Sequence, residues 1–384
     1  MVYKALFVPI MTLLAIACSN SSGGTTAAST STASSCSSSS SSNVGLNEQR
    51  SIKPNSQGHS ETSASNIAAA VSTDTINFCS AGAVRYNTET FSSVTASCNI
   101  TYGSNTNQDG SSQTLKLDLY SPSGDTETSR PLVVFAHGGG FVGGSKDAGQ
   151  EFAQYLAKAG YVAASIQYRL VDANTLAAIQ AGNKTMPTVV KQALVDAVHD
   201  MKAAIRFLVH NNTANNYGID TSKIFIAGYS AGALTALHTA YLSATSELTG
   251  EADLVTYIGN NGNLAGDTDS TPSSSSASFT IKGVLNMAGS VINTGIISAG
   301  EPPLFSIHGT SGETVPYTNG NTDNTGVTTY GSSPIDTAAG NAGITSNVFA
   351  ITNGGHDVFP DGVEATGCEN CQEMSREFFY CNLN

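Results

Sequence analysis

The sequence predicts an α/β fold with a mostly parallel central sheet that helices cover on both faces. Short apolar runs alternate with stretches in which apolar residues recur at helical spacing, an order typical of parallel strands joined by crossover helices. A Gly-x-Ser-x-Gly string at residues 228–232 follows one such run and precedes a helical stretch, as at a sharp strand-to-helix turn. We see no internal repeat.

The expected strands differ in their apolar pattern. Period-two alternation in Leu115–Tyr120 predicts an antiparallel edge strand. Continuous apolar runs, typical of buried parallel strands, lie at Pro131–Ala136, Tyr161–Ile166, Ile224–Ala227, Lys282–Met287, Leu304–Ile307 and Asn347–Ile351. Helical spacing marks Gln150–Ala159 and Val189–Leu208.

Three segments interrupt this alternation: Val171–Pro187, Glu251–Thr280 and Thr318–Gly343. We expect them after strand ends, on the face where open parallel sheets bind ligands. There they would either shape a substrate pocket or be plain surface elaboration.

The N-terminal residues read as an export signal. Residues 1–17 carry Lys4 and an apolar run, Ala5–Ile16, that is too short to span a bilayer. The run ends in an A-x-A cleavage site, and it also resembles a bacterial lipobox that would leave a lipidated Cys18. We therefore expect a lipoprotein at the cell envelope, with a secreted or periplasmic protein as the alternative.

A Ser/Thr-rich segment follows the signal. Residues 18–75 are poor in large apolar groups and cannot bury enough surface to offset the entropy of ordering, so they predict a flexible tether. The globular domain is then expected over residues 76–384. The net charge of −13 and the absence of Lys/Arg clusters argue against nucleic acid or an anionic membrane surface as partner, so the lipid anchor is the one membrane contact we expect.

The chain has seven cysteines, and an exported protein is expected to form disulfides. Cys18 belongs to the signal, and Cys36 lies in the serine tract, where no partner is fixed. The cysteines left for the domain are Cys79, Cys98, Cys368, Cys371 and Cys381.

Two disulfides are expected from these five. Cys79 with Cys98 would close the start of the domain, and Cys381 with Cys368 or Cys371 would hold the C-terminal helix. The connectivity stays open, and the odd count leaves one thiol over. The Cys-x-x-Cys spacing of Cys368 and Cys371 also suits a redox or zinc pair, but no second pair lies at zinc-finger spacing, so a structural bridge is favoured.

Ser230 is the candidate nucleophile. It follows the apolar run Ile224–Ala227, and glycines at 228 and 232 relieve the crowding that such a turn creates. The start of a helix at this point also directs backbone N–H groups toward the serine.

The candidate oxyanion-binding loop is His137-Gly138-Gly139-Gly140, which follows the run that ends at Ala136. Glycines allow the backbone to approach a substrate with its N–H groups. We expect the amides of Gly139 and Gly140, with that of Ala231, to bind an oxyanion. His137 itself reads as a structural histidine.

His356 is the candidate base. It follows the run Asn347–Ile351 through a glycine turn, in the chain order Ser, acid, His. His238 reads as packed within a helix and His308 as shaping the acid loop, and the histidines before Ser230 have no motif around them.

The acid is less well marked. Residues 308–317, HGTSGETVPY, resemble a hydrolase acid loop, but Gly312 stands where the aspartate is expected and Glu313 follows it. The acid only orients and stabilises the imidazolium, so we predict Glu313 in that role, with Asp323 and Asp336 as alternatives. The Asn/Asp-rich run 319–324 has no full calcium loop and reads as a turn.

Taken together, the strings LDLYSP, HGGGFVGGSKD, GYVAASIQYRL, GYSAG, HGTSGETVPY and NGGHDVF resemble esterases of the α/β-hydrolase superfamily over most of residues 115–360. The resemblance is to acetyl-xylan and feruloyl esterase-like enzymes and to relatives of hormone-sensitive lipase. It implies an α/β-hydrolase fold and hydrolysis of carboxylic esters without cofactor or metal. The chain departs from the pattern at Gly312, in the insertion after Leu170 and in its cysteine-bearing tail.

Short acyl or aryl esters, including esters on plant polysaccharide, are the substrates we expect. A lipase or polyester hydrolase, a prolyl-oligopeptidase-like serine peptidase and a non-catalytic binding module on the same fold are the alternatives. A peptidase of that kind carries a large N-terminal propeller, whereas low-complexity chain precedes His137 here. A non-catalytic module on this fold usually lacks the serine, the acid or the histidine. In this chain Ser230 and His356 both lie in the sequence patterns expected of a catalytic serine and histidine.

Overall fold

The computed structural model describes Cys36, Ile76, residues 78–80, Gly82, residues 84–262, Leu264, residues 277–322 and residues 325–384. The predicted signal peptide, Cys18, most of the predicted tether and Asp323 lie outside the described residues. Within the described residues, no helix combines the length and the apolar character that crossing a membrane requires.

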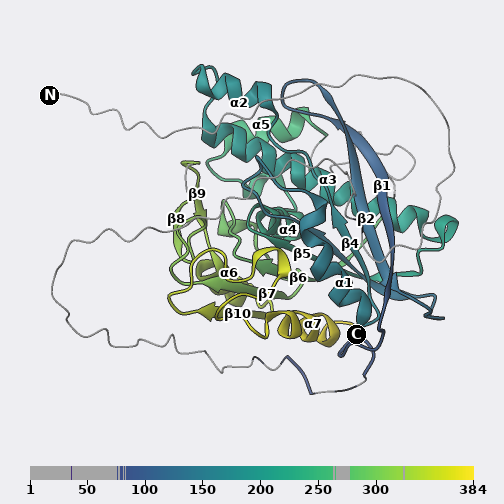
Figure 1. The fold of residues 1–384 in the computed structure, drawn as a ribbon. Coiled ribbons are helices and arrows are strands. Elements are labelled where there is room, and N and C mark those ends of the chain that lie inside the picture. The colour runs from purple at the N-terminus through teal and green to yellow at the C-terminus, as the bar shows by residue number, and fades with distance from the viewer. Residues whose placement is uncertain are drawn as a thin grey trace, which may run out of the picture. The chain divides into compact units, whose positions relative to one another are not determined.

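The fold is built on an eight-stranded sheet in the order β1-β2-β4-β3-β5-β6-β7-β10 (Figure 1). The β1–β2 and β2–β4 pairs are antiparallel, and the pairs from β4 to β10 are parallel. The strands are β1 Val94–Thr106, β2 Ser112–Pro122, β3 Arg130–Ala136, β4 Val162–Ile166, β5 Ile219–Tyr229, β6 Ile281–Met287, β7 Leu304–Gly309 and β10 Ser346–Ile351. A separate two-stranded ribbon pairs β8 (Asn319–Asn321) with β9 (Thr328–Tyr330). The predicted mostly parallel sheet is confirmed.

Each predicted strand is present, but the position predicted for Leu115–Tyr120 is wrong. This segment lies in β2, which is antiparallel as expected but pairs on both sides, with β1 and with β4. The edge strand is β1, which the sequence analysis missed because its polar second half, NITYGSNT, has no regular apolar pattern.

Helices cover both faces of the sheet, as predicted. Alternate residues of β3 enter two different cores, Val134 on one side and Phe135 on the other. The Val134 core includes side chains of α3 and α4, and the Phe135 core includes those of α1 and α7. The helices are α1 Gln150–Lys158, α2 Ala173–Gln180, α3 Met186–Asn215, α4 Ala231–Tyr241, α5 Ala252–Asn260, α6 Ser332–Asn341 and α7 Cys371–Cys381, with short 3-10 turns η1 Lys146–Gly149, η2 Thr245–Glu247, η3 Thr294–Ile296 and η4 Pro360–Gly362.

Two of the three interrupting segments follow strand ends as expected. Val171–Pro187 carries α2 after β4, and Thr318–Gly343 carries β8, β9 and α6 after β7. The expectation is wrong for Glu251–Thr280, which contains α5 and leads into the start of β6. It follows α4 and η2 rather than a strand.

The disulfides correct the expected pairing. Cys36 pairs with Cys98, Cys79 pairs with Cys381, and Cys368 pairs with Cys371. Six of the seven cysteines are therefore paired.

The reason for the Cys79 pairing is tertiary. Phe78 packs edge-on against Phe305 of β7 and Phe378 of α7, with ring centroids 4.8 and 5.6 Å apart. This contact places the start of the domain beside its last helix. The spacing of cysteines in the sequence does not predict this contact.

Candidate functional site

Ser230 lies at a strained turn between β5 and α4, with φ 52° and ψ −120°. The turn requires its flanking glycines: a Cβ on Gly228 would lie 2.1 Å from the carbonyl oxygen of Gly232, and one on Gly232 would lie 2.0 Å from that of Ala136. Such strain persists where the surrounding structure fixes it, and it directs the serine out of the chain path. The side chain is largely shielded, with 6% of the residue exposed.

His356 meets Ser230 directly. Its Nε2 lies 2.9 Å from the serine Oγ, although the two residues are 126 positions apart in the chain. The ring of Tyr229 lies against the imidazole, with centroids 5.2 Å apart. Burial lowers the pKa of His356, while the neighbouring carboxylate of Asp357 opposes that shift. A neutral imidazole at this distance can accept the serine proton.

The other imidazole nitrogen has no partner within the described residues: His356 Nδ1 is buried and makes no hydrogen bond. Glu313 is exposed, and the structure brings neither its carboxylate nor that of Asp336 into a hydrogen bond with His356. The loop that carries Glu313 is nevertheless joined to the turn before the histidine, because the N–H of Ser311 donates to the Gly354 carbonyl at 2.9 Å. Glu313 stays a prediction as the acid.

The glycine loop adopts a backbone that only glycine accommodates easily. Gly139 has φ 118° and Gly140 has φ 62°, and a Cβ on Gly139 would lie 2.2 Å from the carbonyl oxygen of Gly143. Ala231 is the first residue of α4, so its N–H has no helical acceptor. In the part of the chain that the structure describes, the N–H groups of Gly139, Gly140 and Ala231 donate to no carbonyl or side chain. They are available to a ligand.

His137 supports this loop rather than reacting. It is fully buried, and its ring stacks on Tyr168 with centroids 4.4 Å apart. The Tyr168 hydroxyl donates to the His137 carbonyl at 2.8 Å. Burial lowers the pKa of His137 to about 4, so the ring is neutral at pH 7.

A second support comes from the segment after β4. Val171 N–H donates to the Phe141 carbonyl at 2.8 Å, which fastens this segment to the glycine loop. Arg169 anchors the segment: its guanidinium lies 2.9 Å from an Asp200 carboxylate oxygen and 3.4 Å from one of Asp196. These three side chains are almost fully buried. They are a structural part of the site.

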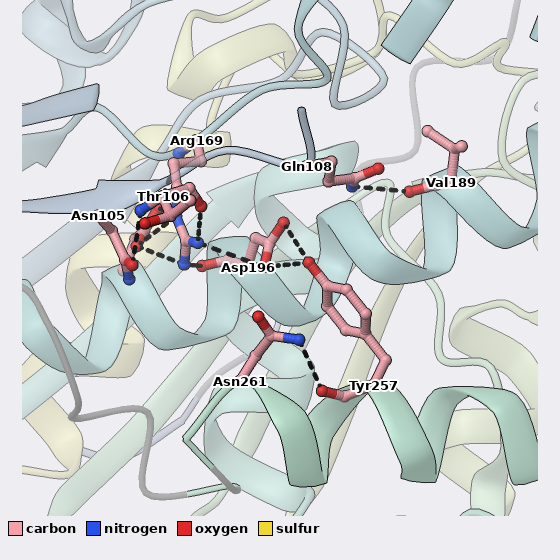
Figure 2. A network of polar contacts seen from close by, with 9 residues as sticks. Asn105, Thr106, Gln108, Arg169, Val189, Asp196, Tyr257 and Asn261 are labelled. Atoms are coloured by element: carbon pink, nitrogen blue, oxygen red, sulfur yellow. Dashed lines mark hydrogen bonds and ion pairs between the residues drawn. The ribbon is translucent and has the colours of Figure 1, made fainter. Parts of the chain in front are cut away.

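Figure 2 shows how this network continues. Arg169 also donates to the Thr106 carbonyl of β1 at 2.8 Å, and the Tyr257 hydroxyl of α5 donates to Asp196 at 2.9 Å. This network was not predicted from the sequence. The signal was present, because Asp196 and Asp200 stand four residues apart within the apolar stripe of α3 and buried carboxylates need a partner.

Two further buried histidines, His308 and His238, are held by hydrogen bonds. His308 lies 3.1 Å from the Val315 carbonyl and 2.9 Å from the Ser332 hydroxyl, so it shapes the loop that carries Glu313, as predicted. His238 contacts the Leu234 carbonyl within its own helix at 2.8 Å, which fits its interpretation as a packed residue.

Potential metal ligands come together at one place in the described residues, Cys36, Cys98 and Asp118. The two sulfurs there form a disulfide, and the carboxylate pairs with Lys146 at 2.7 Å. This arrangement is structural, and it lies among residues that the catalytic geometry does not use.

The known proteins to which this chain is similar are named as esterases. Residues 117–291 match the BD-FAE family model. The chain is 31% identical over 137 residues to an isoprenylcysteine alpha-carbonyl methylesterase of Arabidopsis thaliana, a match that covers 36% of this chain and 27% of that protein. It is 33% identical over 122 residues to the juvenile hormone esterase of Heliothis virescens, covering 32% of this chain and 20% of that protein. The chain thus spans less than a third of the length of these curated relatives.

A solved structure shows the same fold. The butyrate-bound esterase 2 of Thermogutta terrifontis superposes with a TM-score of 0.50 at 20% identity, covering 78% of this chain and 96% of that one. The chain therefore has the fold of this solved esterase, an α/β-hydrolase fold, and its residues 117–291 are similar to the BD-FAE family.

Proposed function

We propose that this protein hydrolyses carboxylic esters through an acyl-enzyme formed on Ser230. The observation that carries the proposal is the 2.9 Å contact between Ser230 Oγ and His356 Nε2 at the strained turn after β5. The matched relatives are named as esterases, which supports the same reaction class for this chain.

In the first half of the reaction His356 Nε2 takes the proton of Ser230 as the serine oxygen bonds to the ester carbonyl carbon. The negative charge that develops on the carbonyl oxygen is bound by the free N–H groups of Gly139, Gly140 and Ala231. The bond to the alcohol oxygen then breaks, and the proton returns from His356 to the leaving alcohol. Water next attacks the acyl carbon and gives a proton to His356 Nε2. The bond from the acyl carbon to Ser230 Oγ then breaks, His356 returns the proton to Oγ, and the carboxylic acid is released.

Glu313 is proposed to accept a hydrogen bond from His356 Nδ1 in the working enzyme. It is the one carboxylate in residues 309–318, and the bond from Ser311 to Gly354 joins its loop to the histidine's turn. Catalytic hydrogen bonds are often long or poorly aligned in the absence of substrate and tighten when it binds, so the exposed position of Glu313 does not conflict with this role.

We propose short acyl or aryl esters as substrates. The alternatives are a lipase or polyester hydrolase, a serine peptidase and a binding module without activity. Export also belongs to the proposal, with lipidation at Cys18 or simple cleavage. Three disulfides support an oxidising compartment.

The test is hydrolysis of a p-nitrophenyl ester series of increasing acyl length, with methyl ferulate, acetylated xylan and a peptide anilide alongside. We expect wild-type protein to cleave the short esters and to leave the anilide intact. We expect Ser230→Ala to hydrolyse the esters at least about 10³-fold more slowly than wild type. Cleavage of the anilide alone would favour the peptidase, and equal rates for wild type and Ser230→Ala would refute the mechanism.

A further inference from the structure

The turn that follows the base carries two aspartates that reach two different parts of the site. The Tyr229 hydroxyl donates to Asp357 Oδ1 at 2.5 Å, beside the nucleophile. The N–H of Gly138 donates to Asp361 Oδ1 at 2.8 Å, across 223 positions of the chain. One short segment therefore contacts both the nucleophile turn and the glycine loop.

Asp361 is fixed in place by its neighbours. Phe359 is buried and packs edge-on against Phe152 of α1, with centroids 6.2 Å apart. Gly362 follows in a left-handed conformation, φ 81°, and a Cβ there would lie 2.5 Å from the Phe152 ring. Asp361 is itself left-handed, with φ 50°. A left-handed conformation costs energy for a residue other than glycine, so it persists only where the surrounding packing holds it. The packing of Phe359 and Gly362 against Phe152 holds Asp361 in this way.

The hydrogen bond from Gly138 sets the orientation of the peptide that begins the glycine loop. Position 138 accepts no side chain, because a Cβ on Gly138 would lie 2.5 Å from the Tyr229 ring, so the backbone lies close against that ring. The next two N–H groups, of Gly139 and Gly140, are those left free for an oxyanion. Their direction depends on the peptide that Asp361 holds.

We propose that Asp361 is the residue that positions the oxyanion loop, acting through the N–H of Gly138 rather than on the substrate. The inference rests on the proposed function. A carboxylate adds negative charge near a forming oxyanion, so its benefit is geometric: donors placed before the reaction need no reorganisation during it. Misplacing such groups by about 1 Å can cost on the order of 10² in rate.

A matched pair of variants tests this role. Glycine and asparagine both tolerate a left-handed φ, but only asparagine keeps a side-chain oxygen that can accept the Gly138 N–H. We expect Asp361→Gly to lower kcat for p-nitrophenyl acetate by at least about 10-fold with KM changed less than about 3-fold. Asp361→Asn should restore kcat to within about 3-fold of wild type, since it keeps the hydrogen bond.

Asp220→Ala is the control. Asp220 also accepts a backbone N–H, from Ser222 at 3.0 Å, and it lies near the start of β5, at the end of that strand away from Ser230. Its loss should leave kcat unchanged. The rate of organophosphate labelling of each variant gives a second readout that needs no turnover.

Three results would overturn the inference: Asp361→Gly with wild-type kcat, Asp361→Asn as slow as Asp361→Gly, or a loss that appears in KM alone. Should Asp361→Gly fail to fold, the Asn variant still decides, because a large loss of kcat in a folded Asp361→Asn protein contradicts the proposal. Failure of the proposed function is distinct, since wild-type protein would then cleave no ester.

Discussion

His356 Nε2 lies 2.9 Å from Ser230 Oγ, so the turns that follow two non-adjacent strands of the sheet meet at one point. Ser230 follows β5 and His356 follows β10, and β6 and β7 lie between these strands. Parallel strands carry their carboxyl ends to the same edge, which is why loops so far apart in sequence converge there. The proposed reaction depends on this convergence.

The state of His356 predicts the acid limb of the pH profile. The imidazole must be neutral to accept the serine proton, and burial lowers its pKa below the ordinary 6.5. We therefore expect kcat/KM to rise with pH, with a midpoint below 6.5, and to stay level through neutral pH.

The neighbouring carboxylate supplies a check on that midpoint. Asp357 raises the pKa of His356, so Asp357→Asn should move the midpoint to still lower pH while keeping an oxygen for the Tyr229 hydroxyl. A midpoint above 6.5 in the wild type, or one that moves upward in the variant, contradicts this assignment.

The acid is tested by two adjacent substitutions. If Glu313 orients His356, Glu313→Gln should lower kcat by about 10² or more, as loss of an orienting carboxylate does elsewhere. Gly312→Asp in that background should recover part of the loss, because it places a carboxylate where the resembled acid loop has one. The added Cβ would lie 2.9 Å from the Val315 carbonyl oxygen, so the loop must shift slightly. An unchanged rate in Glu313→Gln removes Glu313 from the mechanism.

The buried network behind the glycine loop is predicted to stabilise the fold. Arg169→Met leaves the carboxylates of Asp196 and Asp200 buried without their cation, which should cost about 3–5 kcal/mol of unfolding free energy. Tyr257→Phe removes a hydrogen bond to Asp196 and should cost about 1–2 kcal/mol. Urea unfolding followed by circular dichroism measures both, and equal costs would contradict the ranking.

The disulfides should differ in what they contribute. In the chain-entropy view, the Cys79–Cys381 bridge, with a separation of 302 residues, should stabilise by on the order of 5 kcal/mol. The Cys368–Cys371 bridge, with a separation of 3, should stabilise by on the order of 2 kcal/mol. Paired Cys→Ser variants unfolded without reductant test this, and a larger loss from the short bridge would refute it.

The sequence predicted what local pattern controls. The parallel strands are continuous apolar runs, and the turn at Ser230 needs glycines that the sequence displays, so both were predictable. Edge strand β1 was not, because its second half is mostly polar and has no regular apolar pattern. The Cys79–Cys381 pairing depends on Phe78 packing against α7, a contact between chain ends that no spacing encodes.

The residues of the site also fall into a group that the sequence predicts and a group that it does not. The Gly-x-Ser-x-Gly turn predicted Ser230 and chain order predicted His356, and the structure brings the two residues together. The partners of Arg169 and the bond from Gly138 to Asp361 join segments far apart in the chain, so the sequence analysis missed them. The acid loop shows the limit of resemblance, because Gly312 removes the one side chain that the pattern would have supplied.

Ser230 is proposed to form a covalent intermediate with His356 as its base, and intact-mass spectrometry after organophosphate treatment tests this most directly. We expect wild-type protein to gain one phosphoryl adduct, mapped to the peptide that contains Ser230. Ser230→Ala should gain none, and His356→Ala should be labelled at least about 10³-fold more slowly. Folded wild-type protein that takes no label, or Ser230→Ala protein that is labelled as fast as wild type, would contradict the account.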